Sequence, residues 1–244
     1  TDGHLVMAYL FLKAQGLAGK LVADIRIDGA GKKVTRSDNC RVSDLSVSSD
    51  NLTFTYEAKS LPYPIDTSYY DNEKHTQADA LSVIPFMDEM NYEGLSVSGL
   101  SDGYYGLTIG GEFIGRFTAR ELERGINMAL LQNTPQYKQA MKIRQMNEER
   151  WLKERKMREF YWVEYNLMRK TGMLWACDEA AVDTLRKYRP HDIFLQWNGD
   201  LWLQYMHKGI REDCVNEQQD LVDRIYEQNK PIPLQIEIKK FTDL

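Results

Sequence analysis

Residues 104–117, with the sequence YYGLTIGGEFIGRF, decide the predicted fold of the middle of this 244-residue chain. Two short apolar-rich runs, 104–109 and 112–117, flank the pair Gly110-Gly111. Glycine accepts the positive φ angles that a tight two-residue hairpin turn requires. The stretch therefore predicts two antiparallel strands joined by a primed turn.

Several segments upstream of this hairpin also have the two-residue period of strands. They are residues 22–27, 42–47, 52–56 and 95–100, of which 52–56 alternates strictly. Short strands separated by turn residues are typical of all-β domains. We therefore predict a small antiparallel β-sandwich or barrel over residues 18–117.

Downstream of the hairpin the pattern becomes helical. Thr118 and Glu121 have the spacing of a capping box, which predicts a helix to about Leu131. Thr134-Pro135 begins a second helix, which runs to about Lys170 and can end at Gly172. Further helices are predicted, followed by a final alternating strand that can pair with an exposed sheet edge; their ranges are 173–188, 200–212, 215–228 and 234–239.

The chain opens with an apolar segment that predicts a helix over residues 5–15. Leu5, Ala8, Tyr9 and Leu12 recur at helical spacing, and apolar residues also occupy the opposite face. A helix that is apolar most of the way round needs burial on several sides. The predicted fold class is therefore α+β, with an N-terminal helix over 1–17, an antiparallel β-domain over 18–117, and a helical region with a final β-strand over 118–244.

Composition limits the classes of function. The formal net charge of −5 and the pI of about 5.5 argue against a general nucleic-acid binder. No apolar run approaches the roughly 20 residues of a membrane-spanning helix, so no transmembrane segment is expected. Ten Lys and Arg against five Glu over residues 135–170 have two interpretations, a basic binding face or a solvated face. We favour the solvated face, with pairs such as Glu149–Lys153 and Glu154–Arg158 four residues apart.

The residue types that carry catalysis or bind metals form no motif. The three cysteines, Cys40, Cys177 and Cys214, are widely spaced, which leaves open one disulfide with a remaining thiol, or three buried thiols. The four histidines form no HExxH or H-x-x-x-H pattern, and no G-x-S-x-G, P-loop or GxGxxG segment occurs. We therefore expect no metal site and no cofactor.

Several segments resemble SGNH/GDSL-type hydrolases, in a branch common in Bacteroidetes. The resemblance covers roughly residues 1–160, and its segments are GHLVMA at 3–8, FLKAQGL at 11–17, SLPYP at 60–64, NYEGLSV at 91–97, ELERGINMA at 121–129 and TPQ at 134–136. The resemblance implies that residues 1–17 are the last helix of a flavodoxin-like α/β catalytic domain. It also implies a periplasmic or secreted serine esterase that cleaves acyl esters, with acylated carbohydrate as one candidate substrate.

The catalytic motifs of that family are absent from this sequence. The family carries its Ser nucleophile in a Gly-Asp-Ser motif and its Asp and His in a late Asp-x-x-His-Pro block; neither occurs here, since Asp2 and His4 are only two residues apart. Such chemistry needs a base beside the nucleophile and donors for the oxyanion. We therefore expect that Thr1 falls just downstream of the catalytic His, and that this chain alone is inactive without its N-terminal SGNH catalytic domain.

Two residues remain as candidate site residues. His4 is a candidate triad base, against the alternative of a helix-start histidine that is hydrogen-bonded to its surroundings. Asn127 is a candidate substrate-binding residue, against the alternative of a polar residue that holds a helix against the catalytic domain.

Two functions of other classes stay open. One is a non-catalytic carbohydrate- or protein-binding module, with the sandwich binding a glycan or the polar 65–80 loop binding a partner through Tyr69 and Tyr70. The other is a structural domain whose helix over residues 5–12 docks on another chain. The aromatic-rich end of the long helix, residues 160–168, is interpreted as core rather than as a ligand site.

Overall fold

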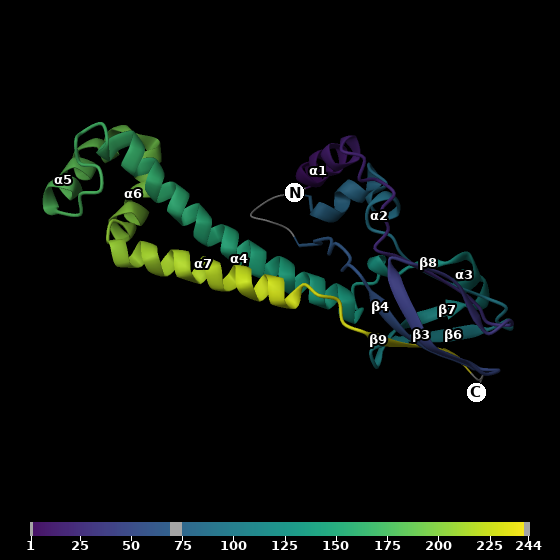
Figure 1. Ribbon diagram of the computed structural model, residues 1–244. Helices are drawn as coiled ribbons and strands as arrows, with labels where there is room; N and C mark the ends of the chain where they lie inside the picture. The colour runs from purple at the N-terminus through teal and green to yellow at the C-terminus, as the bar shows by residue number, and fades with distance from the viewer. Residues whose placement is uncertain (1, 69–74, 242–244) are drawn as a thin grey trace. The chain divides into compact units, whose positions relative to one another are not determined.

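The computed structural model describes residues 2–68 and 75–241. The chain forms two compact units, one of residues 1–142 with 229–244 and one of residues 143–228 (Figure 1). The first unit holds two β-sheets and short helices, and the second is helical. The predicted α+β class is confirmed. Tyr69 and Tyr70 lie outside the described residues.

The first sheet has four strands in the order β2-β1-β5-β8. They are β1 (Ala23–Asp28), β2 (Lys33–Asp38), β5 (Glu93–Ser98) and β8 (Ile126–Asn127). β1 pairs antiparallel with β2 and parallel with β5. The parallel pair departs from a purely antiparallel prediction, because β2, β3 and β4 intervene in the chain before β5 returns beside β1.

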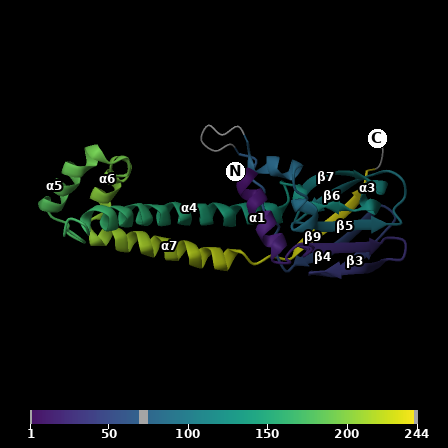
Figure 2. The same cartoon turned by 90° about the horizontal axis from the view of Figure 1, so that it is seen from above.

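The second sheet has five antiparallel strands in the order β3-β4-β9-β6-β7. They are β3 (Cys40–Val47), β4 (Asn51–Ala58), β6 (Tyr104–Ile109), β7 (Glu112–Thr118) and β9 (Leu234–Lys240). The sequence predicts a final strand that can pair with an exposed sheet edge; β9 pairs on both sides and lies between β4 and β6 (Figures 1 and 2). It can lie there because its apolar residues alternate and because β4 and β6 each have an edge that no other strand pairs with.

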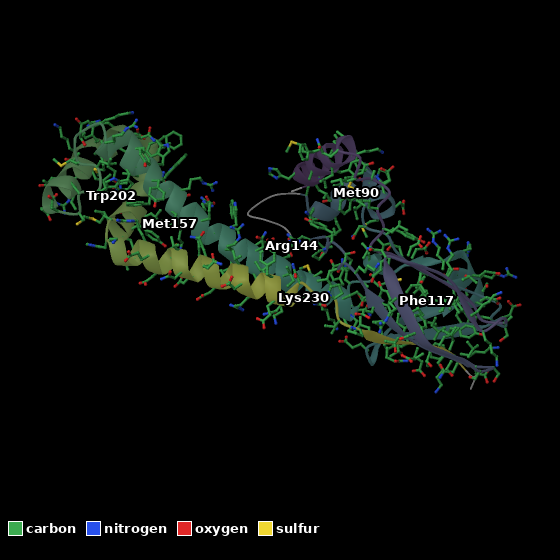
Figure 3. The ribbon with its side chains drawn as sticks, viewed as in Figure 1. Met90, Phe117, Arg144, Met157, Trp202 and Lys230 are labelled. Carbon is green, nitrogen blue, oxygen red and sulfur yellow. The ribbon has the colours of Figure 1, made fainter. Side chains whose placement is uncertain are left out.

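The predicted hairpin is confirmed. Gly110 and Gly111 join β6 to β7 with φ angles of 58° and 84°, which only glycine adopts without steric cost. The apolar residues of both sheets face one core, which includes Ile25 and Leu95 from the first sheet and Phe54 and Ile236 from the second. The two sheets therefore form a sandwich, with Phe117 packed at its margin (Figure 3).

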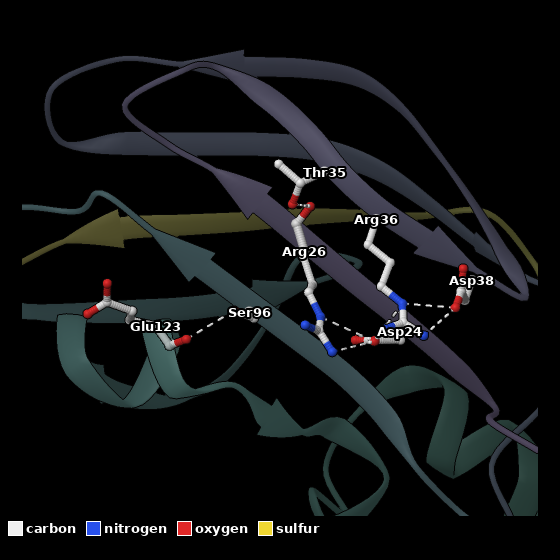
Figure 4. A network of polar contacts seen from close by, with 7 residues as sticks. All are labelled: Asp24, Arg26, Thr35, Arg36, Asp38, Ser96 and Glu123. Carbon is white, nitrogen blue, oxygen red and sulfur yellow. Dashed lines mark hydrogen bonds and ion pairs between the residues drawn. The ribbon is translucent and has the colours of Figure 1, made fainter. Parts of the chain in front are cut away.

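A network of ion pairs lies on the first sheet. The Asp24 carboxylate is buried and accepts from Arg26 at 3.1 Å and Arg36 at 3.0 Å (Figure 4). Arg36 also donates to Asp38 at 2.8 Å. This network joins β1 to β2, since Arg36 and Asp38 come from the second strand.

Short helices complete the first unit. α1 (Asp2–Ala14) confirms the predicted N-terminal helix, and α2 is Phe86–Glu89. The capping box is confirmed, because Thr118 Oγ1 accepts from the Glu121 N–H at 3.2 Å at the start of α3 (Ala119–Arg124). The prediction that this helix reaches Leu131 is wrong, since Gly125 has a φ of 94° and the chain enters β8.

α4 (Pro135–Val163) begins in the first unit and continues into the second, where α5 (Glu179–Tyr188), α6 (Ile193–Tyr205) and α7 (Lys208–Gln228) follow. The long helix is confirmed through residue 168, and Gly172 turns with a φ of 74°. The predicted ends at residues 188 and 228 are confirmed, whereas the predicted starts of the later helices and the predicted end at residue 212 are wrong. Asp178 and Asp192 start α5 and α6 as N-caps, and the chain leaves the helix between residues 205 and 208.

Within the second unit, α4 and α7 lie side by side (Figures 1 and 2). Lys153 donates to Glu217 at 2.6 Å, so its partner is not the predicted Glu149. The predicted pair Glu154–Arg158 is present at 3.7 Å. Met157 and Trp202 belong to the buried cluster of this unit (Figure 3). The charged face of α4 is therefore partly used for helix packing.

The three cysteines are all free thiols. Cys40 and Cys214 are buried, whereas Cys177 is exposed. Burial raises the pKa of the Cys40 thiol to about 11. Among the described residues, no helix is long and apolar enough to cross a membrane.

Candidate functional site

α1 joins the first unit through one face only. Leu5 and Tyr9 are buried among residues that include Ile84 and Phe86. The Tyr9 hydroxyl donates to Glu89 at 2.7 Å, and Lys13 pairs with the same carboxylate at 2.8 Å. This pairing raises the pKa of Lys13 to about 12. The helix is thus held firmly to the segment that contains α2.

The opposite face of α1 is apolar and open in this chain. Met7, Leu10 and Phe11 are 61%, 56% and 65% exposed. They follow the i, i+3, i+4 spacing of a single helical face. Clustered exposed apolar side chains of this kind mark an interaction surface. His4 lies one turn before Met7 and is also exposed.

The structure places His4 and Asn127 on different elements. His4 lies in the first turn of α1, and its role as a catalytic base stays a prediction. The Asn127 side chain accepts from the Glu93 N–H at 2.9 Å and the Ala129 N–H at 3.1 Å, and its amide donates to Met87 O at 3.1 Å. These contacts tie β8 to β5 and α2. A substrate role for Asn127 also stays a prediction.

A buried carboxyl group lies close to Asn127, in the interior of the first unit. Glu93 is 0% exposed, and its Oε1 accepts from the Tyr56 hydroxyl at 2.8 Å and from Gln136 Nε2 at 3.3 Å. Burial raises the pKa of Glu93 to about 7. Perturbed carboxyl groups often mark active sites, but a catalytic group must be reachable by substrate. We therefore assign Glu93 to the stability of the core.

In the second unit, α4 passes directly into a π-helical segment, Glu164–Met168. The Arg169 N–H donates to the Glu164 carbonyl at 2.8 Å, a five-residue step instead of four. Such segments are rare and occur frequently at functional sites. The wider turn changes which side chains face the rest of the unit.

The Glu164 side chain holds this segment in place. It is buried and accepts from Trp202 Nε1 at 2.8 Å and from the Trp175 N–H at 2.9 Å. Trp175 has a φ of 63°, a conformation that costs free energy for a bulky residue. The carboxylate thus couples α6 and the turn after Gly172 to the π-helical segment.

Replacing Glu164 by Gln is expected to destabilise the protein by about 1–2 kcal/mol, because a charged acceptor of two hydrogen bonds becomes a neutral one. Urea unfolding followed by tryptophan fluorescence measures the change. Glu149→Gln, on an exposed position of the same helix, is the matched control. Equal stabilities of the two variants would contradict the role assigned to Glu164.

A surface hollow of about 360 Å³ lies beside the π-helical segment. One wall comes from the end of α4, the π-helical segment and the turn after it, through Trp162, Asn166, Leu167, Lys170 and Thr171. The other wall comes from the end of α5 and the start of α6, through Tyr188, His191, Asp192 and Leu195. Its volume lies at the lower end of small-molecule sites, which span roughly 300–1,000 Å³.

Packing fixes the walls of this hollow. The Phe194 ring lies 5.2 Å from the Trp162 ring, and Trp197 lies 5.6 Å from Phe194. Asp192 Oδ1 accepts from the Phe194 N–H at 2.8 Å and so caps α6. Asn166 Nδ2 donates to the Trp162 carbonyl at 2.9 Å. The indole and the two polar side chains are therefore oriented before any ligand arrives.

The interpretation of residues 160–168 as core is correct for part of the segment. Phe160 and Val163 are buried, whereas Tyr161 and Tyr165 are exposed and Trp162 lines the hollow. Sequence reasoning missed the hollow because its second wall lies some 20 residues downstream. Among the described residues, no cluster of His, Cys, Asp and Glu could hold a metal ion.

Comparison with known proteins finds a matching family for the helical part of the chain and a similar solved structure for almost all of it. Residues 141–230 match the family described as the C-terminal helical domain of diltiazem deacetylase. The whole chain is similar to a solved structure described as a gut microbial diltiazem-metabolizing enzyme. The sequences are 40% identical, the TM-score is 0.92, and the match covers 98% of this chain and 54% of that one. No curated protein sequence matches the chain.

This chain therefore spans about half the length of the solved relative. The similarity includes the sandwich and the helical unit, since almost all of the chain is matched. The matched family corresponds closely to the second unit, residues 143–228, which contains the hollow.

Proposed function

We propose that this chain is the C-terminal part of an acyl-ester hydrolase of the SGNH/GDSL type. The observation that carries the proposal is the 40% identity with a diltiazem-metabolizing enzyme over 98% of this chain. The match of residues 141–230 to a domain of diltiazem deacetylase supports an acyl group as the part removed. The hydrolysed bond is an ester, and an acylated carbohydrate in the periplasm or outside the cell is the substrate class we favour.

In this proposal the nucleophile and its base come from a catalytic domain outside the present sequence. The absence of Gly-Asp-Ser and Asp-x-x-His-Pro from the 244 residues supports it. The exposed face of α1 supports it too, because Met7, Leu10 and Phe11 are suited to pack against a domain of that kind. Residues 1–17 would then complete the catalytic domain.

A chimera tests the proposal. The half of the diltiazem-metabolizing enzyme that this chain does not match is joined to Thr1, and release of acetate from diltiazem and from acetylated xylan is measured. We expect turnover by the chimera and none by the 244-residue chain. Turnover by the chain alone would contradict the external nucleophile, and a folded but inactive chimera would contradict the hydrolase assignment.

Phe11→Asp in the chimera is expected to lower turnover by about tenfold or more, because burying an aromatic side chain contributes about 2 kcal/mol or more. The same change should leave the thermal stability of the 244-residue chain unaltered, since Phe11 is 65% exposed there. His4→Gln in the chimera tests the alternative in which His4 is the base. A loss of several thousandfold would support that alternative.

A further inference from the structure

The hollow in the second unit carries chemistry that the proposed hydrolase does not use. The apolar part of its lining consists of the buried side chains of Leu167 and Leu195 and the indole of Trp162. Its rim carries an ammonium group, an imidazole and a phenol, from Lys170, His191 and Tyr188. An apolar pocket with a few polar groups is the usual form of a small-molecule site.

The cation at the rim is available to a ligand. Lys170 makes no ion pair or hydrogen bond with any described residue, whereas Lys153, Arg155 and Arg158 on the preceding helix are all paired. The carboxylate nearest in the lining is Asp192, whose Oδ1 already accepts the N–H groups of Phe194 and Leu195. An anionic group on a ligand would therefore find an unshared ammonium group.

The aromatic walls favour a ligand with a flat apolar face. Trp162 and Tyr188 both line the hollow, and the Phe194 ring lies 5.2 Å from the Trp162 ring. Stacking on such rings is effective when the rings are already fixed, because little side-chain entropy is lost on binding. The hydrogen-bonding groups of Asn166, His191 and Tyr188 exceed what a simple aromatic acid could satisfy, and suit a hydroxylated ring.

We propose that this hollow binds a hexuronate unit of an acidic glycan. The sugar ring lies against Trp162, its carboxylate pairs with Lys170, and its hydroxyl groups bond to the polar rim. The inference is independent of the proposed hydrolase, because the hollow lies wholly in the second unit and binding requires no reaction.

Calorimetric titration of the 244-residue protein tests the assignment with three probes, methyl β-D-glucuronide, methyl β-D-glucoside and benzoate. We expect the glucuronide to bind about tenfold more tightly than the glucoside, since a charge-assisted hydrogen bond contributes that much. Lys170→Met should abolish this preference. Lys156→Met, an exposed lysine of α4 outside the lining, is the matched control and should keep it.

A second variant tests the position of the ring. Trp162→Leu is expected to weaken both sugars about tenfold, with far-ultraviolet circular dichroism confirming that the helices remain. Equal binding of glucuronide and glucoside by the native protein, absence of binding, or an unchanged preference in Lys170→Met would overturn the proposal. Binding of benzoate without glucuronide would overturn the sugar assignment in favour of an aromatic acid. These outcomes do not depend on acetate release, so they separate this inference from the hydrolase proposal.

Discussion

Replacing Glu93 by Gln is expected to remove a pH-dependent loss of stability of about 3 kcal/mol. The pKa of Glu93 rises from an ordinary 4.5 to about 7 because the carboxyl group is buried. A raised pKa in the folded protein means that protonated Glu93 stabilises the fold. This contribution of Glu93 to stability is complete below pH 4.5, the pKa in the unfolded chain. It is lost as the pH rises through 7, the pKa in the folded protein. At about 1.4 kcal/mol for each pKa unit, the shift corresponds to about 3 kcal/mol.

Burial favours the neutral acid of Glu93, against the hydrogen bonds from Tyr56 and Gln136, which favour the carboxylate. Glu93 Oε2 and Gln136 Oε1 are both buried acceptors that have no hydrogen-bond partner among the described residues. An ionised Glu93 brings no proton to either atom, whereas the acid brings one donor. The amide of Glu93→Gln brings a donor at every pH and retains an acceptor for the Tyr56 hydroxyl.

Urea unfolding at pH 4.5, 6 and 8 measures the effect. The free-energy difference between Glu93→Gln and the native protein should move by about 3 kcal/mol in favour of the variant from the lowest pH to the highest. Glu123→Gln, at an exposed position on α3, is the control and should follow the native curve. Parallel curves for all three proteins would contradict a neutral Glu93.

The features that the sequence predicted correctly depend on residues close together in the chain. The Thr118–Glu121 capping box, the Gly110-Gly111 turn and the end of the long helix at Gly172 each need only a few neighbouring residues. The parallel pairing of β1 with β5 and the interior place of β9 depend on partners far away in the chain. Alternating patterns show that a strand exists, but not which strands flank it.

The hollow shows a second limit of sequence reasoning. Residues 160–165 are rich in aromatic side chains. The α-helical period does not predict which of them stay exposed, because the π-helical segment that begins at Glu164 shifts the faces of the helix. The fold also brings His191, which lies 21 residues after Lys170 in the chain, to the same hollow as Lys170. The sequence offers one signal, Glu164 within an aromatic segment, because a carboxylate that is buried there needs donors from other elements.

Replacing Ile236 by Ala is expected to destabilise the first unit by about 3 kcal/mol, near the middle of the range for truncating a buried Ile. Ile236 is 0% exposed and lies opposite Phe54 on β4 and Ile109 on β6. The loss should be large because β9 is an interior strand. A cavity at Ile236 lies between β4 and β6, and both of these strands are already paired along their other edges. Urea unfolding of the native and variant proteins measures the difference.

The control for this prediction lies on the same strand. Lys239→Ala changes an exposed side chain of β9 and should alter the free energy of unfolding by less than about 0.5 kcal/mol. An Ile236→Ala effect as small as that of the control would contradict the interior position of β9. If the large effect is found, the sandwich depends on a strand that the chain supplies only after the whole helical unit. The helical unit, residues 143–228, is then an insertion in the chain of the sheet-bearing unit, which continues at both of its ends.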